Sequence, residues 1–237
     1  MLLASFCVAI AVLGPIPAAL AGLVNGDFES GSFAGWRLEI PQGVSEHSST
    51  RMPAGTARIF GAWSDGTPWE RMPLSGHRFA GLGTQDHAEF EGHRSYTLSL
   101  SQKLTLEPGN QLTGWACFYN GDLDPQDLAW VRVLDSAGTL VATPWSESSG
   151  GLRTCDPNFT PYRTTSPWTF WHWEAASAGN YTLSLGITTS GDNNGASFGF
   201  FEDICLKALA NPVPEPGSLS FLGMAALLAL RKRRPHN

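Results

Sequence analysis

The sequence predicts an all-β fold, an antiparallel β-sandwich, across residues 22–212. About eight segments in this range alternate apolar and polar side chains, the pattern of strands that bury one face. Glycine, proline, asparagine and aspartate gather between these segments, as at residues 107–110 and 192–195, and they favour turns. Helical periodicity is weak throughout. A stretch of about 190 residues suits one all-β domain with long loops better than two domains.

The amino-terminal end predicts export. Residues 1–21 hold no charged side chain, residues 2–13 form an apolar run, and Pro15 and Pro17 lie just after that run and break it. Ala19 and Ala21 supply the small side chains that signal peptidase requires, so we expect a signal peptide cut after Ala21.

The carboxyl-terminal end, residues 213–237, has three ordered parts. Two prolines that cannot continue a helix or strand come first, within Val213, Pro214, Glu215 and Pro216. An apolar run of 14 residues comes next at 217–230, which predicts a hydrophobic helix shorter than the ~20 residues of a comfortable membrane span. The end is basic, and the positive-inside rule keeps it cytoplasmic; its cations are Arg231, Lys232, Arg233 and Arg234.

These three parts in this order resemble the PEP-CTERM sorting signal of Gram-negative bacteria. The resemblance implies processing by signal peptidase and by an exosortase, a membrane protease of species that make extracellular polysaccharide. It further implies that the chain is held transiently in the inner membrane and then reaches the cell surface or the extracellular matrix. The alternative interpretation of the same residues is a plain carboxyl-terminal tail anchor.

The net charge of the domain indicates which ligands it can bind, and its cysteines indicate which disulfides or metal sites can form. The tail carries four of the 15 basic and one of the 21 acidic side chains, which leaves 11 against 20 in the rest. Such an acidic domain is not expected to bind nucleic acid. Of the three cysteines after the signal, Cys117, Cys155 and Cys205, two are expected to pair in an oxidising compartment. We favour Cys117 with Cys155, because a bridge would tether the loop-like residues 154–157. No cysteine spacing matches a zinc site.

The first segment of the domain, residues 23–29, carries an Asn-Gly turn signal and leads to a Gly-Trp at 35–36. Together with the strand-like residues 77–84 and 96–106 and the closing residues 202–206, it resembles the jelly rolls of carbohydrate-binding modules and galactose-binding-like domains. The resemblance implies that residues 23–29 form the first strand and that Phe28 and Trp36 are core residues. It also implies a structural calcium held by Glu29 together with Glu202 or Asp203. The alternative is that backbone donors and water satisfy these acids.

Further strands are expected at 112–118, 129–134, 139–141, 181–187 and 198–206, whereas residues 41–73 are expected to be loop with one or two short strands. Residues 168–174 place aromatic side chains on both faces of a strand. A sandwich buries only one face, so this segment suggests either a binding surface or cover from a loop.

Tryptophans are the candidate ligand-binding residues. A sugar ring stacks on an exposed aromatic face, and the candidates by loop or face position are Trp63, Trp69, Trp145 and Trp171. The competing interpretation for such side chains is hydrophobic packing on the sheet.

Two acidic segments are open to more than one interpretation. On a strand, one face would carry His87, Glu89, Glu91 and His93, which could hold a metal or supply acid and base. Gly92 favours the alternative, a solvated loop. The loop that contains Asp122, Asp124 and Asp127 has carboxylates for calcium without the spacing of an EF-hand.

Three functions remain open at this point. The leading expectation is an exported, non-catalytic envelope or matrix protein that binds carbohydrate. The second is a polysaccharide hydrolase that uses Glu89 and Glu91, since such enzymes need two carboxylates at a set separation. The third is a structural or adhesive surface protein that binds nothing small.

Overall fold

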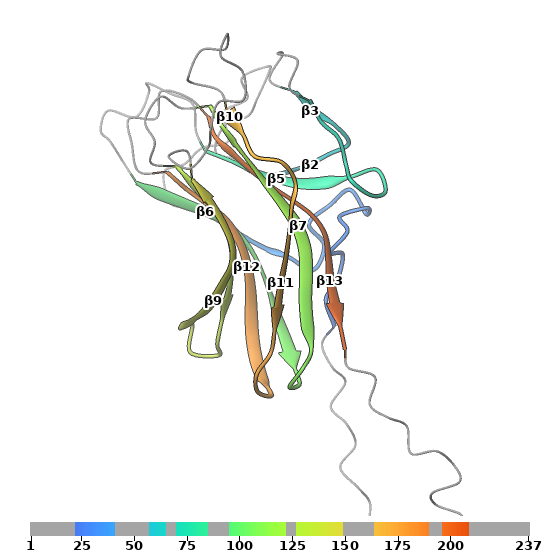
Figure 1. Ribbon diagram of the computed structural model, residues 1–237, viewed down its shortest axis with the longest axis vertical. Coiled ribbons are helices and arrows are strands. Elements are labelled where there is room, and N and C mark those ends of the chain that lie inside the picture. The colour runs from blue at the N-terminus through green and yellow to red at the C-terminus, as the bar shows by residue number, and fades with distance from the viewer. Residues whose placement is uncertain are drawn as a thin grey trace, which may run out of the picture.

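The computed structural model describes seven stretches of the chain, residues 22–40, 57–64, 70–84, 95–121, 127–148, 164–189 and 196–208 (Figure 1). Every regular element in these stretches is a strand, which confirms the predicted all-β class. The strands are β1 (Arg37–Glu39), β2 (Ala57–Phe60), β3 (Trp63–Ser64), β4 (Glu70–Arg71), β5 (Phe79–Gly83), β6 (Tyr96–Leu106), β7 (Gln111–Asn120), β8 (Leu128–Leu134), β9 (Leu140–Ser148), β10 (Thr164–Thr165), β11 (Thr169–Glu174), β12 (Gly179–Thr189) and β13 (Phe198–Lys207).

The strands form two main antiparallel sheets. A five-stranded sheet has the order β1-β6-β12-β8-β9, and a six-stranded sheet has the order β10-β7-β13-β5-β2, with β11 also paired to β7. Strands that are distant in sequence lie side by side in both sheets, which is the connectivity of a sandwich rather than of a simple meander. Strands β3 and β4 pair with each other and form a third, two-stranded sheet.

The core lies between the two sheets and follows the alternation of the strands. In β6 and β12 the side chains of Leu98, Leu100, Leu104, Leu183 and Leu185 point inward and are fully buried. The residues between them face the outside of the five-stranded sheet. Phe28 and Trp36 also belong to this core, with ring centroids 5.6 Å apart, as expected from the sequence.

A second apolar cluster covers the outer face of the six-stranded sheet at one end. It consists of Trp63, Phe79, Cys117, Tyr119, Ala196, Phe198 and Phe200. Trp63 comes from the β3-β4 hairpin and packs on the rings of Tyr119 and Phe200, at 4.6 and 5.0 Å between centroids. Gly81 in β5 leaves room for Phe60 and Phe200, since a Cβ there would lie 2.5 Å from the Phe60 ring.

One expected strand is wrong. Residues 23–29 form bends and turns, and the first strand is β1, which comes after Trp36. The backbone shows why: Asn25 and Phe28 have positive φ angles of 52° and 57°, outside the region of regular strands, and they turn the chain twice within four residues. The other expected strands are present, some of them longer than expected, as with β9 and β12. In the described stretches there is no helix with the length and apolar character of a membrane span.

Candidate functional site

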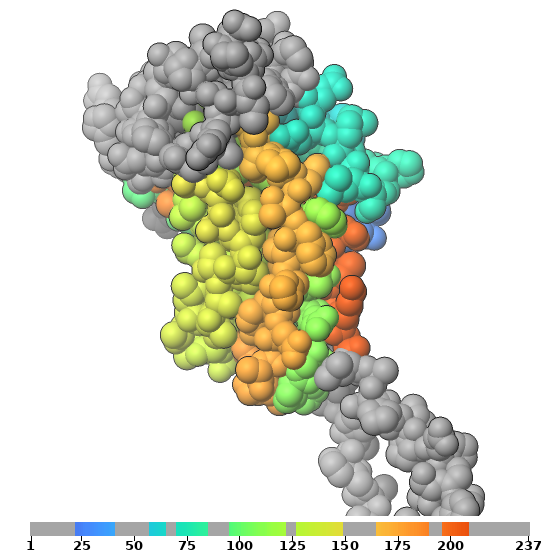
Figure 2. Space-filling view, viewed as in Figure 1, coloured from blue at the N-terminus to red at the C-terminus, as the bar shows by residue number. Residues whose placement is uncertain are grey.

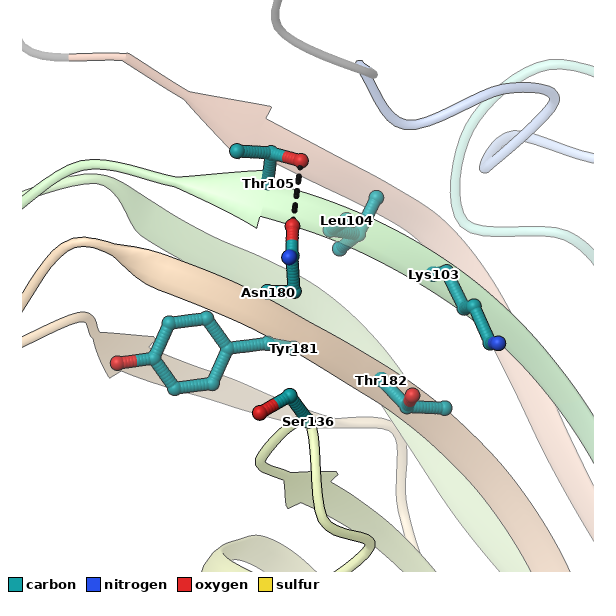
Figure 3. A pocket seen from close by; sticks show the side chains of 7 residues that line it. All are labelled: Lys103, Leu104, Thr105, Ser136, Asn180, Tyr181 and Thr182. Atoms are coloured by element: carbon teal, nitrogen blue, oxygen red, sulfur yellow. Dashed lines mark hydrogen bonds between the residues drawn. The ribbon is translucent and has the colours of Figure 1, made fainter.

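A pocket of about 280 Å³ opens on the outer face of the five-stranded sheet. It is lined by Lys103, Leu104, Thr105, Ser136, Asn180, Tyr181 and Thr182 (Figure 3). In that view Thr105 and Asn180 face each other, with the Tyr181 ring and Ser136 beside them and Lys103 and Thr182 toward the other end. Three stretches that are far apart in the sequence therefore contribute to one depression.

The pairing of β6 with β12 sets the arrangement of four of these side chains. Lys103 lies opposite Thr182, and Thr105 lies opposite Asn180. All four are at outward positions, because the intervening side chains, Leu104 and Tyr181, belong to the core. Thr105 Oγ1 donates to Asn180 Oδ1 at 2.9 Å, which holds the carboxamide upright and leaves its NH2 group available to a ligand.

Ser136 reaches the pocket from the turn between β8 and β9. The Asp135 carboxylate accepts hydrogen bonds from the amides of Ala137 and Thr139, at 2.9 and 2.8 Å, and thereby fixes the turn. Gly138 takes the positive φ of 80° that the turn requires. The serine is therefore presented by a rigid turn, which lowers the conformational entropy lost on binding a ligand.

The chemistry of this lining is that of recognition. Hydroxyls, a carboxamide and an ammonium group can donate and accept hydrogen bonds to many polar partners. Among the described residues that line the pocket there is no aspartate or glutamate.

Beyond the pocket, polar side chains continue along the outward positions of β6, β12 and β8. Ser101 lies opposite Ser184 in β12, and Ser184 lies opposite Arg132 in β8. The Arg132 guanidinium stacks over the Trp130 ring at 4.2 Å from the centroid, and Trp130 Nε1 donates to Thr188 Oγ1 at 3.2 Å. This outer face thus carries a cation on each side of β12, Lys103 and Arg132.

The outer face of the six-stranded sheet has a different character. Outside the end that Trp63 covers, it exposes an apolar patch, in which Met72, Leu74 and Phe170 are 56%, 50% and 49% exposed. Phe170 packs edge-on against Trp115, with 5.3 Å between centroids, and Trp168 Nε1 donates to the Met72 carbonyl. We call these five residues, Met72, Leu74, Trp115, Trp168 and Phe170, the apolar patch. Figure 2 looks onto the side of the molecule on which β11 lies between β9 and the strands β7 and β13.

Three of the four tryptophans that were expected to bind a ligand are described by the structure. Trp63, Trp145 and Trp171 are buried, with 5%, 6% and 2% exposure. Trp63 belongs to the second cluster and the other two to the main core, so the structure places all three among packed side chains instead of at a stacking surface. Trp69 lies outside the described residues.

The acids expected to hold calcium hold the backbone instead. Glu29 Oε1 accepts hydrogen bonds from the amides of His77 and Arg78, at 2.6 and 2.8 Å. These amides, His77 foremost, hold the pKa of Glu29 below its ordinary value. Glu202, which is 1% exposed, accepts from the amides of Leu74 and Ser75 at 2.8 and 2.7 Å. The two glutamates therefore converge on one segment, residues 74–78.

The expected calcium site stays a prediction. Amide hydrogens already occupy both oxygens of Glu202, and Asp203 sits in an irregularity of β13 with a positive φ of 51°. In the stretches that the structure covers, no group of three or more His, Cys, Asp or Glu side chains could hold a metal ion. The interpretation in which backbone donors satisfy the acids describes Glu29 and Glu202.

Cysteine placement differs from the expected bridge. Cys117 is a free thiol, fully buried in the second cluster, and Cys205 is a free thiol with partial exposure. Cys155 lies outside the described residues. Alternation explains the burial of Cys117, because it occupies an outward position of β7 that the β3-β4 hairpin covers.

We expect Cys117 to resist alkylation in the folded protein. Burial raises the pKa of its thiol to about 12, so the reactive thiolate is scarce at pH 8. Iodoacetamide treatment and peptide mass spectrometry should find Cys205 labelled first, and Cys117 only after unfolding in urea. Equal labelling rates, or a Cys117–Cys155 peptide found without reduction, would contradict this placement.

Several expected residues lie outside the described stretches and stay predictions. They are Ala19 and Ala21 of the signal cleavage site, the residues His87, Glu89, Glu91 and His93, the loop residues Asp122 and Asp124, and the whole carboxyl-terminal segment with Val213, Pro214, Glu215, Pro216, Arg231, Lys232, Arg233 and Arg234. Asp127, the third acid of its loop, is buried.

The pocket residues were not among those predicted from the sequence. Alternation identifies Lys103, Thr105 and Thr182 as outward side chains of strands, which is the ordinary place for polar residues. Nothing in the sequence shows that β6 pairs with β12 or that the turn at Ser136 lies beside them. The one usable signal was the alternation itself, which fixes the face of each side chain.

Residues 212–234 match the PEP-CTERM protein-sorting motif. No curated protein is similar enough in sequence to count as a relative. Solved structures with a similar arrangement include a family 61 carbohydrate-binding module in complex with β-1,4-galactotriose, with 15% identity, a TM-score of 0.42, and coverage of 78% of this chain and 97% of that one. Another is the K3 adhesin domain of Lys-gingipain from Porphyromonas gingivalis, with 16% identity, a TM-score of 0.46, and coverage of 79% and 99%. A third is a carbohydrate-binding module specific for non-crystalline cellulose, with 10% identity, a TM-score of 0.38, and coverage of 79% and 94%.

The order of the strands in the two sheets establishes the sandwich, and the motif match confirms the sorting signal that residues 213–237 predicted. The motif indicates an exported protein. The chain therefore joins an antiparallel β-sandwich to a PEP-CTERM protein-sorting motif at residues 212–234.

Proposed function

We propose that this chain is an exosortase-processed protein of the cell envelope or extracellular matrix whose sandwich binds extracellular polysaccharide without catalysis. The sorting motif supports the route, because the expected processing removes the hydrophobic tail at the Pro-Glu-Pro. The observation that carries the binding function is the pocket lining, in which hydroxyls, a carboxamide and an ammonium group converge.

Polysaccharides present many hydroxyl groups, each of which donates and accepts hydrogen bonds. The pocket offers matching groups on the rigid strands β6 and β12, at positions that their register fixes. A binding module needs no more than this, whereas a hydrolase would also need two carboxyl groups at the bound sugar.

The apolar patch favours a second candidate function, adhesion to another surface. Three large apolar side chains about half exposed on one face are typical of an interaction site. Replacement of Phe170 by serine would then abolish attachment and leave sugar binding at the pocket intact. The two functions can thus be separated by one side chain.

We expect the Thr182→Val variant to bind polysaccharide about tenfold more weakly than wild type, because an isosteric change removes one hydrogen-bonding hydroxyl from the pocket. The measurement is a screen of the full chain in mild detergent on a polysaccharide array, with calcium and with a chelator, and then titration of the best glycan. Thr97→Val is the matched control, since Thr97 is an exposed threonine on the same outer face but does not line the pocket.

Equal losses in the two variants would show that the pocket is not the binding site. Absence of binding by folded wild type to every glycan, with and without calcium, would reject the proposal and favour the adhesive alternative. Loss of binding with the chelator alone would revive the expected calcium site.

A further inference from the structure

We propose that the pocket on the five-stranded sheet selects an anionic saccharide, a sugar residue that carries a carboxylate or a sulfate. This inference rests on the proposed function, because it names the class of polysaccharide that the same pocket takes. The charges on the outer face of the five-stranded sheet support it.

Among the residues that the structure describes, Lys103 has no counter-ion. Its side chain is exposed at the pocket, and in the described stretches the one ion pair joins Arg37 Nε to Glu39 Oε1 at 3.3 Å. A lysine that lines a pocket with only uncharged neighbours is available to pair with a charged group of the ligand.

Arg132 supplies a second cation on the same face. It lies opposite Ser184, while Lys103 lies opposite Thr182, two residues along the same strand. The Cα atoms of the two cations are therefore about 12 Å apart by the spacing of sheet strands. The stacking of Arg132 on Trp130 fixes its direction, and the outward hydroxyls of Thr182 and Ser184 lie between the two charges.

The two cations lie on a protein whose net charge is negative. The formal net charge is −6, so two cations for which the described residues supply no acidic partner are not the consequence of a generally basic surface. A uniformly acidic surface would repel an anionic polymer. A polymer with charges on successive sugars could instead meet both cations while its hydroxyls meet those of β12.

Polygalacturonate and its methyl ester form the sharpest ligand pair, because the ester has the same backbone with its carboxylates neutralised. We expect the full chain to bind the acid form at least about fivefold more tightly at low salt, an effect in the upper range for an exposed ion pair. The preference should shrink as salt screens the charges. Dextran sulfate against dextran provides the second arm and distinguishes sulfate from carboxylate recognition.

Lys103→Gln should remove the preference for the acid form, whereas Lys103→Arg should retain most of it. Lys207→Gln is the matched control, since Lys207 is an exposed lysine at the end of β13 in the other sheet. All three replacements are at exposed positions, so folding should be unaffected, and circular dichroism checks this.

Equal affinity for both members of each ligand pair would overturn the inference. Equal losses from Lys103→Gln and Lys207→Gln would also overturn it, because binding would then reflect net charge alone. If neutral polymers bind and Thr182→Val weakens them, the proposed function stands and only the anionic preference fails. If no polymer binds, the proposed function fails as well.

Discussion

Replacing Trp171 by alanine is expected to lower the free energy of unfolding by about 3–5 kcal/mol, the range for a large aromatic side chain removed from a core. Trp171 is 2% exposed and packs in the main core. It lies against Gly114, where a Cβ would approach Cζ2 of the indole to 2.7 Å. The residue opposite Trp171 in β7 therefore has no side chain that could fill the cavity. Urea unfolding monitored by far-ultraviolet circular dichroism measures the change.

Phe170→Ala is the matched control for this prediction. Phe170 is the preceding residue of β11 but is 49% exposed on the opposite face. Its replacement should change the free energy of unfolding by roughly 0.5–1 kcal/mol, as for other surface positions with one good contact. A larger loss from Phe170→Ala than from Trp171→Ala would reverse the assigned faces of β11.

The second large effect is expected at Glu202. Its carboxylate accepts two backbone hydrogen bonds, from Leu74 and Ser75, and is itself buried. Glu202→Ala leaves both amides without this acceptor, and we expect a loss of about 2–4 kcal/mol. Limited proteolysis should find faster cleavage near residues 74–78. Glu29→Ala removes the other carboxylate that holds this segment, and it should lower the free energy of unfolding by less. A larger loss from Glu29→Ala than from Glu202→Ala would contradict the prediction.

Glu202 should also make stability depend on pH. Burial raises the pKa of its carboxyl above the ordinary 4.5, although the amides of Leu74 and Ser75 act in the opposite direction. Since the folded-state pKa exceeds the unfolded one, the contribution of this group is fully present below the unfolded pKa. It is lost as pH rises through the folded pKa.

The comparison that isolates this effect is wild type against Glu202→Gln, which keeps the shape and does not titrate. The stability of wild type relative to the variant should fall as pH rises from about 4 through the folded pKa and then level off. Melting temperatures of both proteins between pH 4 and 8 give this difference, because the remaining carboxyl groups cancel. A difference that grows with pH would mean that the amides dominate and that the pKa of Glu202 is lowered.

The sequence predicted much of the fold because the signals were local. Alternation at residues 96–106 and 181–187 located β6 and β12, and the turns between strands carried glycine, proline or aspartate. The prediction was wrong at residues 23–29. Phe28 is buried as expected, yet its segment is not a strand, because positive φ angles at Asn25 and Phe28 turn the chain.

The burial of the tryptophans could not be predicted from neighbouring residues either. Trp63 lies in a mostly polar stretch, and only the apolar outer face of the six-stranded sheet beneath the β3-β4 hairpin explains its burial. Conversely, Lys103 and Thr182 looked like ordinary surface residues. Their role in the pocket depends on strand pairing and on a turn more than 30 residues away from Lys103 in sequence, at Ser136.

By itself the sequence determined the all-β class, the faces of most strands and the sorting motif at residues 212–234, because alternation, turn residues and a linear motif are properties of neighbouring residues. Only the tertiary structure decided that Glu29 and Glu202 hold one backbone segment, and that Lys103, Ser136 and Asn180 share one pocket. Those relations arise from the pairing and packing of distant strands, and the free energy that fixes them comes from burial of a core to which all the strands contribute.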